Sequence, residues 1–198
     1  GPITLAGDMR GWDFRNQDVA GGRFDRGSQL AGAKWEGANL QGTLFFVNTM
    51  PATGFRFSDV RKVRFSASNL DGSNFGGSNL SEAEFSEASL ISARFDRAQL
   101  PKARFVRTNL QSASFVDADL RGTDFVFSES LVGTDFTGAD IIGADFSYAT
   151  DDGFTIDQLR STRSYQQRDL SGVVFEGVKF PAIDLSNFRL AGGDFNRA

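Results

Sequence analysis

Large apolar residues recur at every fifth position along most of this chain. Between residues 35 and 125 the pattern has no exception, and Phe mostly alternates with an aliphatic residue. A period of five fits neither the 3.6-residue period of an α-helix nor the two-residue period of a β-strand. The chain must therefore turn by a fixed angle once per repeat. The centres of these repeats are Trp35, Leu40, Phe45, Met50, Phe55, Val60, Phe65, Leu70, Phe75, Leu80, Phe85, Leu90, Phe95, Leu100, Phe105, Leu110, Phe115, Leu120 and Phe125.

A small residue stands two positions before most centres, as at Ala38, Ser68 and Ala118. Asn or Asp often stands directly before the centre, as at Asn69 and Asp119. One large and one small inward position in every five residues describe one short side of a coil, and the other three positions face water. The pattern predicts a solenoid with a continuous core of stacked side chains.

Three runs carry a resemblance to a known family. They are Ala38-Asn39-Leu40-Gln41-Gly42, Ser68-Asn69-Leu70-Asp71-Gly72 and Ala118-Asp119-Leu120-Arg121-Gly122. Each matches the A(D/N)LXX motif, and most of the chain resembles the pentapeptide-repeat proteins. The resemblance implies an all-β solenoid, a right-handed quadrilateral β-helix in which residues twenty apart stack. A single domain over residues 1–198 would then contain about nine 20-residue coils, with Phe centres on two opposite sides.

The five-residue period is interrupted three times, twice by one extra residue and once by an inserted loop at about 147–168. These interruptions lie between Phe24 and Leu30, between Phe125 and Leu131, and between Phe146 and Leu170. Counting sides by stacking places the three Phe residues on one side and the three Leu residues on the next. We therefore expect both bulges and the insertion to lie along a single edge of the rod, where a solenoid often carries its functional surface.

The insertion has the sequence features of a short helix at about 156–161. Thr155 and Gln158 match a capping box, and Phe154 and Leu159 have the spacing of a hydrophobic staple. We expect the apolar residues, which include Ile156, to cover the side of the rod. The alternative is that these apolar residues form a surface that binds a partner.

Exposed charges form columns when the sequence is read at intervals of twenty. One column alternates in sign through Arg64, Glu84, Arg104 and Asp124, and a second does so through Lys62, Glu82 and Lys102. Opposite surface charges about 5 Å apart attract by less than ~1 kcal/mol per pair. We interpret these columns as features that stabilise the rod and fix the register between neighbouring coils.

Acidic residues gather between residues 122 and 159, which contain no Lys or Arg. One interpretation is that they only occupy the Asp/Asn position of the repeat, where the carboxylate can accept a hydrogen bond from nearby backbone. The other is an acidic interaction patch for a basic protein partner. The residues of this candidate patch are Asp135, Asp140, Asp145, Asp151, Asp152 and Asp157.

Composition narrows the function further. The chain has no His and no Cys, which removes the commonest general base, the commonest metal ligand and all thiol chemistry. We therefore expect no catalytic residues, no metal and no cofactor. A net charge of −4 argues against direct nucleic-acid binding, and no apolar run is long enough to span a membrane. The opening Gly1-Pro2 looks like the remnant of a removed tag, so the sequence leaves the cellular compartment unknown.

These observations favour a non-catalytic rigid scaffold for protein–protein interaction, with an unknown partner. The family resemblance implies one alternative, because some members mimic a DNA duplex and bind and protect gyrase. Here the middle coils are nearly charge-balanced, and residues 193–198 are ordinary repeat. A carbohydrate-active enzyme on a β-helix is a remote third possibility. If residue 198 is the natural terminus, the unpaired last coil would permit an end-to-end homodimer.

Overall fold

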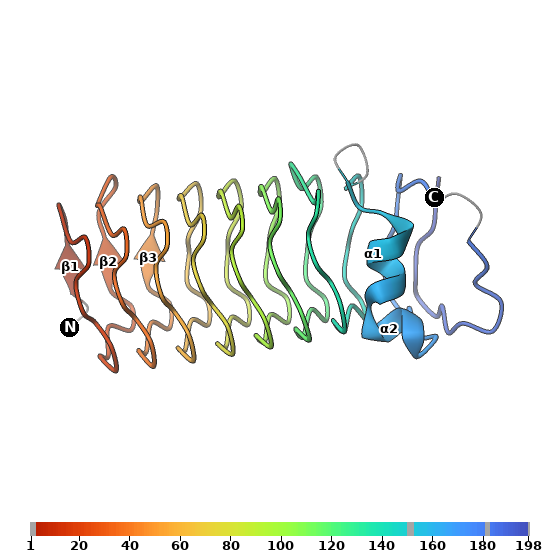
Figure 1. Cartoon of the computed structure of the whole chain (residues 1–198), viewed down its shortest axis with the longest axis horizontal. Coiled ribbons are helices and arrows are strands. Elements are labelled where there is room, and N and C mark those ends of the chain that lie inside the picture. Colours follow the sequence, from red (N-terminus) through yellow and green to blue (C-terminus); the bar gives the residue numbers. More distant parts are fainter. Residues whose placement is uncertain (1–2, 150–152, 181–182, 198) are drawn as a thin grey trace.

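The chain winds into a rod of coils stacked along one axis (Figure 1). The computed structural model describes residues 3–149, 153–180 and 183–197. Three short parallel strands, β1 (Thr4–Leu5), β2 (Arg23–Phe24) and β3 (Leu44–Phe45), pair in the order β1-β2-β3. Beyond β3 the parallel pairing continues as isolated bridges between residues twenty apart, such as Asp59 and Asn79. The fold is therefore a β-helix solenoid, in which each coil pairs with the coil before and after it.

Each side of a coil ends in a tight turn. In the side centred on Leu80, the Ala83 amide donates to the Leu80 carbonyl at 3.0 Å. Glu82, inside this turn, has a φ of 59°, and Gly77 has a φ of 69° at the same position of the preceding side. Glycine adopts a positive φ more readily than other residues. The turn redirects the chain once per five residues, which is the geometric cause of the sequence period.

The centre residues form one continuous core. Phe95 is fully buried and stacks on Phe75 at 4.9 Å and on Phe115 at 4.8 Å, one coil before and one coil after it. Phe85 and Phe105, from the opposite side, meet its ring edge to face at 5.8 and 5.6 Å. Each such aromatic pair adds about 0.5–1.5 kcal/mol beyond area burial. The prediction that Phe centres occupy two opposite sides is confirmed.

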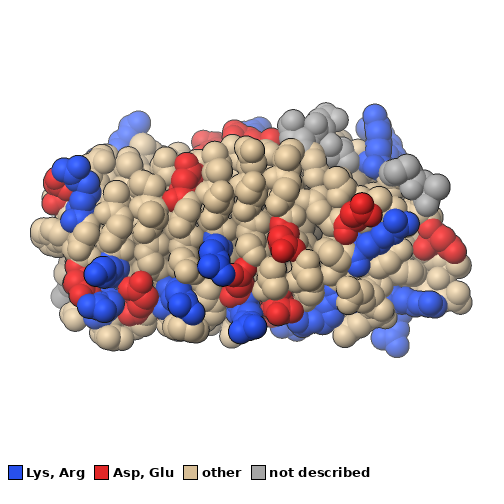
Figure 2. Space-filling view, viewed as in Figure 1, with Lys and Arg blue, Asp and Glu red and all other residues tan. Residues whose placement is uncertain are grey.

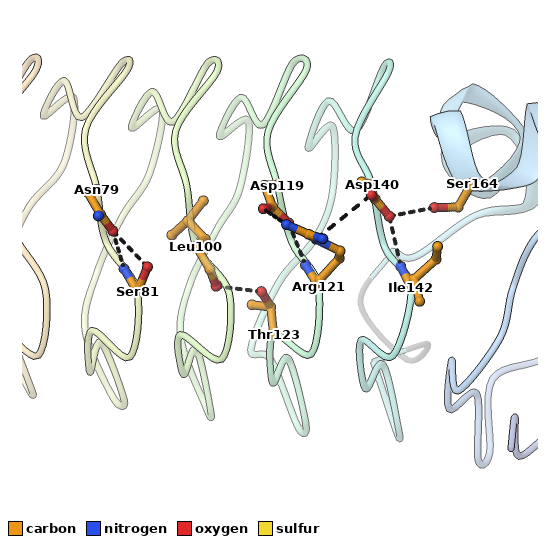
Figure 3. Close-up of polar contacts among 9 residues, drawn as sticks. All are labelled: Asn79, Ser81, Leu100, Asp119, Arg121, Thr123, Asp140, Ile142 and Ser164. Carbon is orange, nitrogen blue, oxygen red and sulfur yellow. Dashed lines mark hydrogen bonds and ion pairs between the residues drawn. The ribbon is translucent and has the colours of Figure 1, made fainter.

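The small inward positions that carry Ser or Thr keep their hydroxyls hydrogen-bonded. The Thr123 hydroxyl donates to the Leu100 carbonyl of the preceding coil at 2.9 Å (Figure 3). The Ser68 hydroxyl donates to the Phe45 carbonyl at 2.7 Å in the same way. A buried hydroxyl with a partner avoids the penalty of about 1–3 kcal/mol for an unsatisfied group. Polar residues are therefore tolerated inside this core.

Both one-residue bulges lie at the same corner of the rod. The pairing steps by twenty-one residues there, for example between Asn109 and Ser130. Phe24 and Phe125, which precede the two bulges, belong to one aromatic column that continues to Phe146. The predicted common edge is confirmed for the bulges.

The insertion leaves the rod at this corner too, but the predicted side for its return is wrong. The Gly143 amide donates to the Ser171 carbonyl at 2.9 Å. Leu170 therefore continues the column of Ile141 and not that of Leu131. The insertion replaces two sides of one coil instead of looping out from a single corner. Counting in fives cannot reveal this, because the inserted residues do not follow the period.

Two short helices fill these two sides. Helix α1 spans Ile156–Ser161 and helix α2 spans Arg163–Gln166, and Figure 1 shows both against the side of the rod. The Thr155 hydroxyl accepts from the Gln158 amide at 3.2 Å, and the Gln158 side chain accepts from the Thr155 amide at 2.7 Å. This is a complete capping box, and it fixes the start of α1.

The residues around the capping box attach the insertion to the core. Phe154 and Leu159 are buried, and the Phe154 ring stacks on Phe146 at 4.5 Å. The Gln158 side chain also donates to the carbonyls of two residues in the preceding coil at 2.9 and 2.8 Å. The insertion is thus part of the packed rod. Within the described residues, neither helix has the length and apolar character needed to cross a lipid bilayer.

Candidate functional site

The acidic residues of the candidate patch do not share one surface. Asp135, Asp140 and Asp145 each precede a core centre, and the three centres lie on three successive sides of one coil. The Asp135 carboxylate accepts from the Thr137 amide at 2.9 Å, and the Asp145 carboxylate accepts from the Ser147 amide at 2.9 Å. Both carboxylates thus make the local backbone bond of the repeat. Two further predicted members, at positions 151 and 152, lie outside the described residues.

Asp140 is held from three directions (Figure 3). Its carboxylate accepts from the Ile142 amide and from the Ser164 hydroxyl, both at 3.2 Å, and lies 3.9 Å from the Arg121 guanidinium. Arg121 also pairs with Asp119 at 2.6 Å, and this bond holds the pKa of Asp119 below its ordinary value. Asp140 therefore ties α2 to the rod and offers little free charge to a partner.

Asp157 is a member of the patch whose side chain is exposed to solvent. Its side chain is 90% exposed and lies 3.7 Å from the Arg160 guanidinium, one turn along α1. Asp157 and Asp135 line a shallow groove of about 560 Å³ beside α1, together with Thr155 and Gln158. Among the described members of the predicted patch, the structure brings only these two Asp residues together.

Two exposed aromatic residues at the bulge corner were missed by the sequence prediction. Phe127 lies in the second bulge and Tyr148 at the start of the insertion, and they are 50% and 38% exposed. Their rings stack with centroids 5.0 Å apart and planes 9° from parallel. The Tyr148 hydroxyl donates to the Glu176 carboxylate, and this hydrogen bond raises the pKa of Tyr148. We call Phe127, Tyr148 and Glu176 the aromatic edge.

The backbone of the aromatic edge is unfavourable for these side chains. Phe127 and Tyr148 occupy the positive-φ position of their turns, with φ values of 53° and 58°. The left-handed conformation costs a residue other than Gly roughly 1–2 kcal/mol. The same φ is the rule at this turn position, where Glu82 and Arg107 also adopt it. Aromatic residues are enriched at protein interfaces. The signal in the sequence was an aromatic residue two positions after a core centre.

Phe57 is a third aromatic residue at this turn position, on another side of the rod. It has a φ of 60° and is 66% exposed. Its ring covers Gly77 of the next coil, and the Arg56 guanidinium lies 4.9 Å from the ring centroid. Phe57 therefore stands alone among polar neighbours and is a matched control for the aromatic edge.

Acidic side chains surround the aromatic edge. Asp194 and Arg197 act electrostatically on Tyr148 in addition to Glu176. Asp145 precedes Tyr148 by three residues in the same coil, and its carboxylate accepts from the Ser147 hydroxyl at 2.5 Å. The local balance is therefore negative. Among the described residues, no group of three acidic side chains has the geometry of a metal site.

A solenoid whose sides are each five residues long defines a class of repeat protein. The model of the family described as pentapeptide repeats matches the chain in eight copies, over residues 58–97, 88–125 and 130–150. Residues 58–125 and 130–150 are therefore pentapeptide repeats. No curated protein sequence matches the chain significantly.

Several solved structures resemble the chain. A trypsin-treated variant of QnrB1, a plasmid-mediated fluoroquinolone resistance protein, is 16% identical over 98% of this chain and 89% of that one, with a TM-score of 0.48. HetL, involved in heterocyst differentiation regulation in the cyanobacterium Nostoc sp. strain PCC 7120, is 16% identical over 98% and 86%, with a TM-score of 0.36. A pentapeptide repeat protein from the Arabidopsis thaliana thylakoid lumen is 24% identical over 77% and 71%, with a TM-score of 0.34. At these TM-scores the likenesses carry no argument about function.

Proposed function

We propose that the chain is a non-catalytic, rigid solenoid that binds a protein partner through the aromatic edge. We further infer that it is a single right-handed domain of about nine coils. The observation that supports the binding role most is the stack of Phe127 on Tyr148, because both aromatic rings are exposed. Exposed aromatic residues are over-represented at protein interfaces.

The aromatic edge can supply part of the binding energy of an interface. Phe and Tyr side chains each bury about 150–250 Å² when fully covered. Covering the exposed parts of Phe127 and Tyr148 would remove on the order of 180 Å² from water, which contributes about 4 kcal/mol at ~25 cal/mol per Å². The rod is rigid, so little conformational entropy is lost when a partner binds.

The charge around the edge supports a partner with basic side chains. Glu176 and Asp194 lie beside Tyr148, and Arg197 offsets one of the two charges. A basic and apolar segment would pair with these carboxylates and cover both rings. The proposal keeps the basic protein partner expected from the sequence, but it moves the contact surface from Asp140 to the aromatic edge.

DNA mimicry with gyrase binding has less support. A DNA duplex presents an unbroken series of negative charges, whereas acidic and basic side chains are interspersed over the face seen in Figure 2. Arg10, Arg61 and Arg121 each pair with a neighbouring Asp at 2.5–2.6 Å. We expect the protein to leave gyrase supercoiling and its inhibition unchanged. Protection of gyrase at stoichiometric concentration would favour this second candidate.

Site-specific photocrosslinking tests the proposal. A photoreactive phenylalanine analogue at position 127 should crosslink the partner in cells, because that ring is covered in the complex. The same analogue at position 57 is exposed too, at 66% against 50% for Phe127, and has a similar φ. Position 57 lies on another side of the rod, so the analogue there should not crosslink that protein. Equal crosslinking at both positions, or at position 57 alone, would show that the aromatic edge is not the contact surface.

A further inference from the structure

The side of the rod that carries the aromatic edge changes charge from one end to the other. We call it the gradient side, and its exposed positions flank a single column of core centres. These centres are Phe24, Phe45, Phe65, Phe85, Phe105, Phe125, Phe146, Phe175 and Phe195.

The N-terminal third of the gradient side is basic and has its own exposed aromatic residue. Arg23, Arg26 and Arg64 line a hollow of about 260 Å³ together with Phe46. Phe46 is 52% exposed. Asp25 offsets one of the three positive charges, since its carboxylate lies 2.8 Å from the Arg23 guanidinium.

The middle of the gradient side is balanced. Arg104 pairs with Glu84 at 3.2 Å and with Asp124 at 3.5 Å, one coil to each side of it. Glu87 and Arg107 occupy the turn position of the same two coils, again with opposite signs. The charges on these two coils therefore cancel.

The last four coils of the gradient side, from the coil of Phe125 onward, are acidic and hold the aromatic edge. Asp124, Asp145, Glu176 and Asp194 stand in its successive coils, and Arg197 is the base among them. The gradient side thus runs from basic with one exposed aromatic residue, through neutral, to acidic with two stacked aromatic residues. Such a surface is complementary to itself when it is turned end for end.

We propose that a second copy of this chain packs antiparallel against the gradient side. The inference rests on the proposed function, because it names a second copy as a partner of the aromatic edge. The two-fold axis would lie in the interface plane, across the rod, between the coils of Glu84 and Arg104. This axis reverses the direction of the rod and keeps left and right, so each column of exposed residues faces the same column of the other copy.

Counting coils outward from that axis gives the contacts. Glu84 faces Arg104 of the second copy, and Arg64 faces Asp124. Phe46 faces Ser147, which lies next to Tyr148, and the coil of Glu176 faces the coil that carries Arg23, Asp25 and Arg26. A parallel arrangement would instead place like charges opposite one another, which costs free energy.

The dimer is expected to be weak and sensitive to salt. The strip from the coil of Arg23 to the coil of Glu176 covers seven coil spacings, or about 34 Å at ~4.8 Å each. It is only one side wide, so the buried area lies near the low end of specific interfaces, about 1,200 Å² in total. Exposed charges attract over about 10 Å at 0.1 M salt and over about 3 Å at 1 M.

Sedimentation velocity of the whole chain over a range of concentrations tests the proposal. The wild-type chain should dimerise at low salt, and its dissociation constant should rise at least tenfold between 0.05 and 0.5 M NaCl. A wild-type chain that stays monomeric at low salt, or a dimer that is indifferent to salt, would overturn the proposal. This measurement uses only the wild-type chain, so its result does not depend on whether a variant folds.

Two charge-reversed variants then locate the interface. One carries Arg23→Glu, Arg26→Glu and Arg64→Glu, which makes both ends of the gradient side acidic. The other carries Asp124→Lys, Asp145→Lys and Glu176→Lys, which makes both ends basic. Each alone should lose at least tenfold in self-association, and an equimolar mixture should form a heterodimer. Self-association by either variant at the wild-type strength, or a mixture that stays monomeric, would overturn the proposal.

A matched control reverses three charges on another side, with Arg56→Glu, Arg94→Glu and Arg97→Glu. These residues line the hollow beside Phe57, and the control should dimerise like the wild type. Loss of its dimer would contradict the assigned side. The crosslink at position 127 separates the two hypotheses: a monomeric chain that crosslinks a different protein there refutes the dimer and leaves the proposed function standing.

Discussion

Replacing Phe127 by Gly separates the cost of the aromatic edge from the cost of the core. Gly removes the left-handed strain, a gain of roughly 1–2 kcal/mol. The same change loses the stack on Tyr148, about 1 kcal/mol, and the half of the Phe side chain that is buried, about 1 kcal/mol. The net change in the free energy of unfolding should therefore stay within about 1 kcal/mol of the wild type. Phe125→Ala, two residues away in the same coil, should cost about 3–5 kcal/mol because Phe125 is fully buried.

Urea unfolding followed by circular dichroism and tryptophan fluorescence measures both values under the same conditions. A Phe127→Gly variant that loses as much stability as Phe125→Ala would show that Phe127 is a structural residue. The interpretation of the aromatic edge as a binding surface would then be wrong.

Three further predictions concern the cap, a turn and the exposed ion pairs. Thr155→Ala removes one bond of the capping box and should lower the free energy of unfolding by about 0.5–2 kcal/mol, measured by urea titration, whereas Thr155→Ser should not. Gly77→Ala places a Cβ at positive φ within 2.6 Å of the Phe57 ring; it should destabilise the rod by about 1 kcal/mol, and Phe57→Ala in the same chain should recover part of the loss. The arginine partners of Asp8 and Asp13 lower the pKa of both carboxyls to about 2, so NMR titration of their carboxyl carbons should give midpoints near 2 instead of the ordinary ~3.9. Because these folded-state pKa values are depressed, their contribution to stability is present above about pH 4 and is lost as the pH falls towards 2.

The core could be predicted from the sequence because each coil repeats the same geometry. A fully buried centre such as Phe95 stands five residues from the next centre and twenty from its stacking partner, so the period alone determines its neighbours. The common corner of the two bulges follows in the same way from Phe24 and Phe125. The capping box at Thr155 is local and depends on residues three apart.

The five-residue period does not predict which surface residues lie close together. Asp135 and Asp140 are only five residues apart in the sequence. Five residues take the chain to the next side of the rod, so the two side chains lie on different surfaces. The return of the insertion at Leu170 depends on how many sides an irregular segment replaces, and the period does not contain this information. Phe127 and Tyr148 lie twenty-one residues apart and meet only because a bulge shifts the register by one.

Partner capture from a cell extract by the immobilised chain tests the proposed binding role most directly. The Phe127→Gly/Tyr148→Gly double variant removes both exposed rings, and Phe57→Gly is the control, which removes an exposed ring from the same turn position on another side of the rod. Quantitative mass spectrometry of the retained proteins should show at least a tenfold loss of the partner on the double variant and no loss on the control. Full retention of the partner by a folded double variant would contradict the assignment of the aromatic edge as the binding surface.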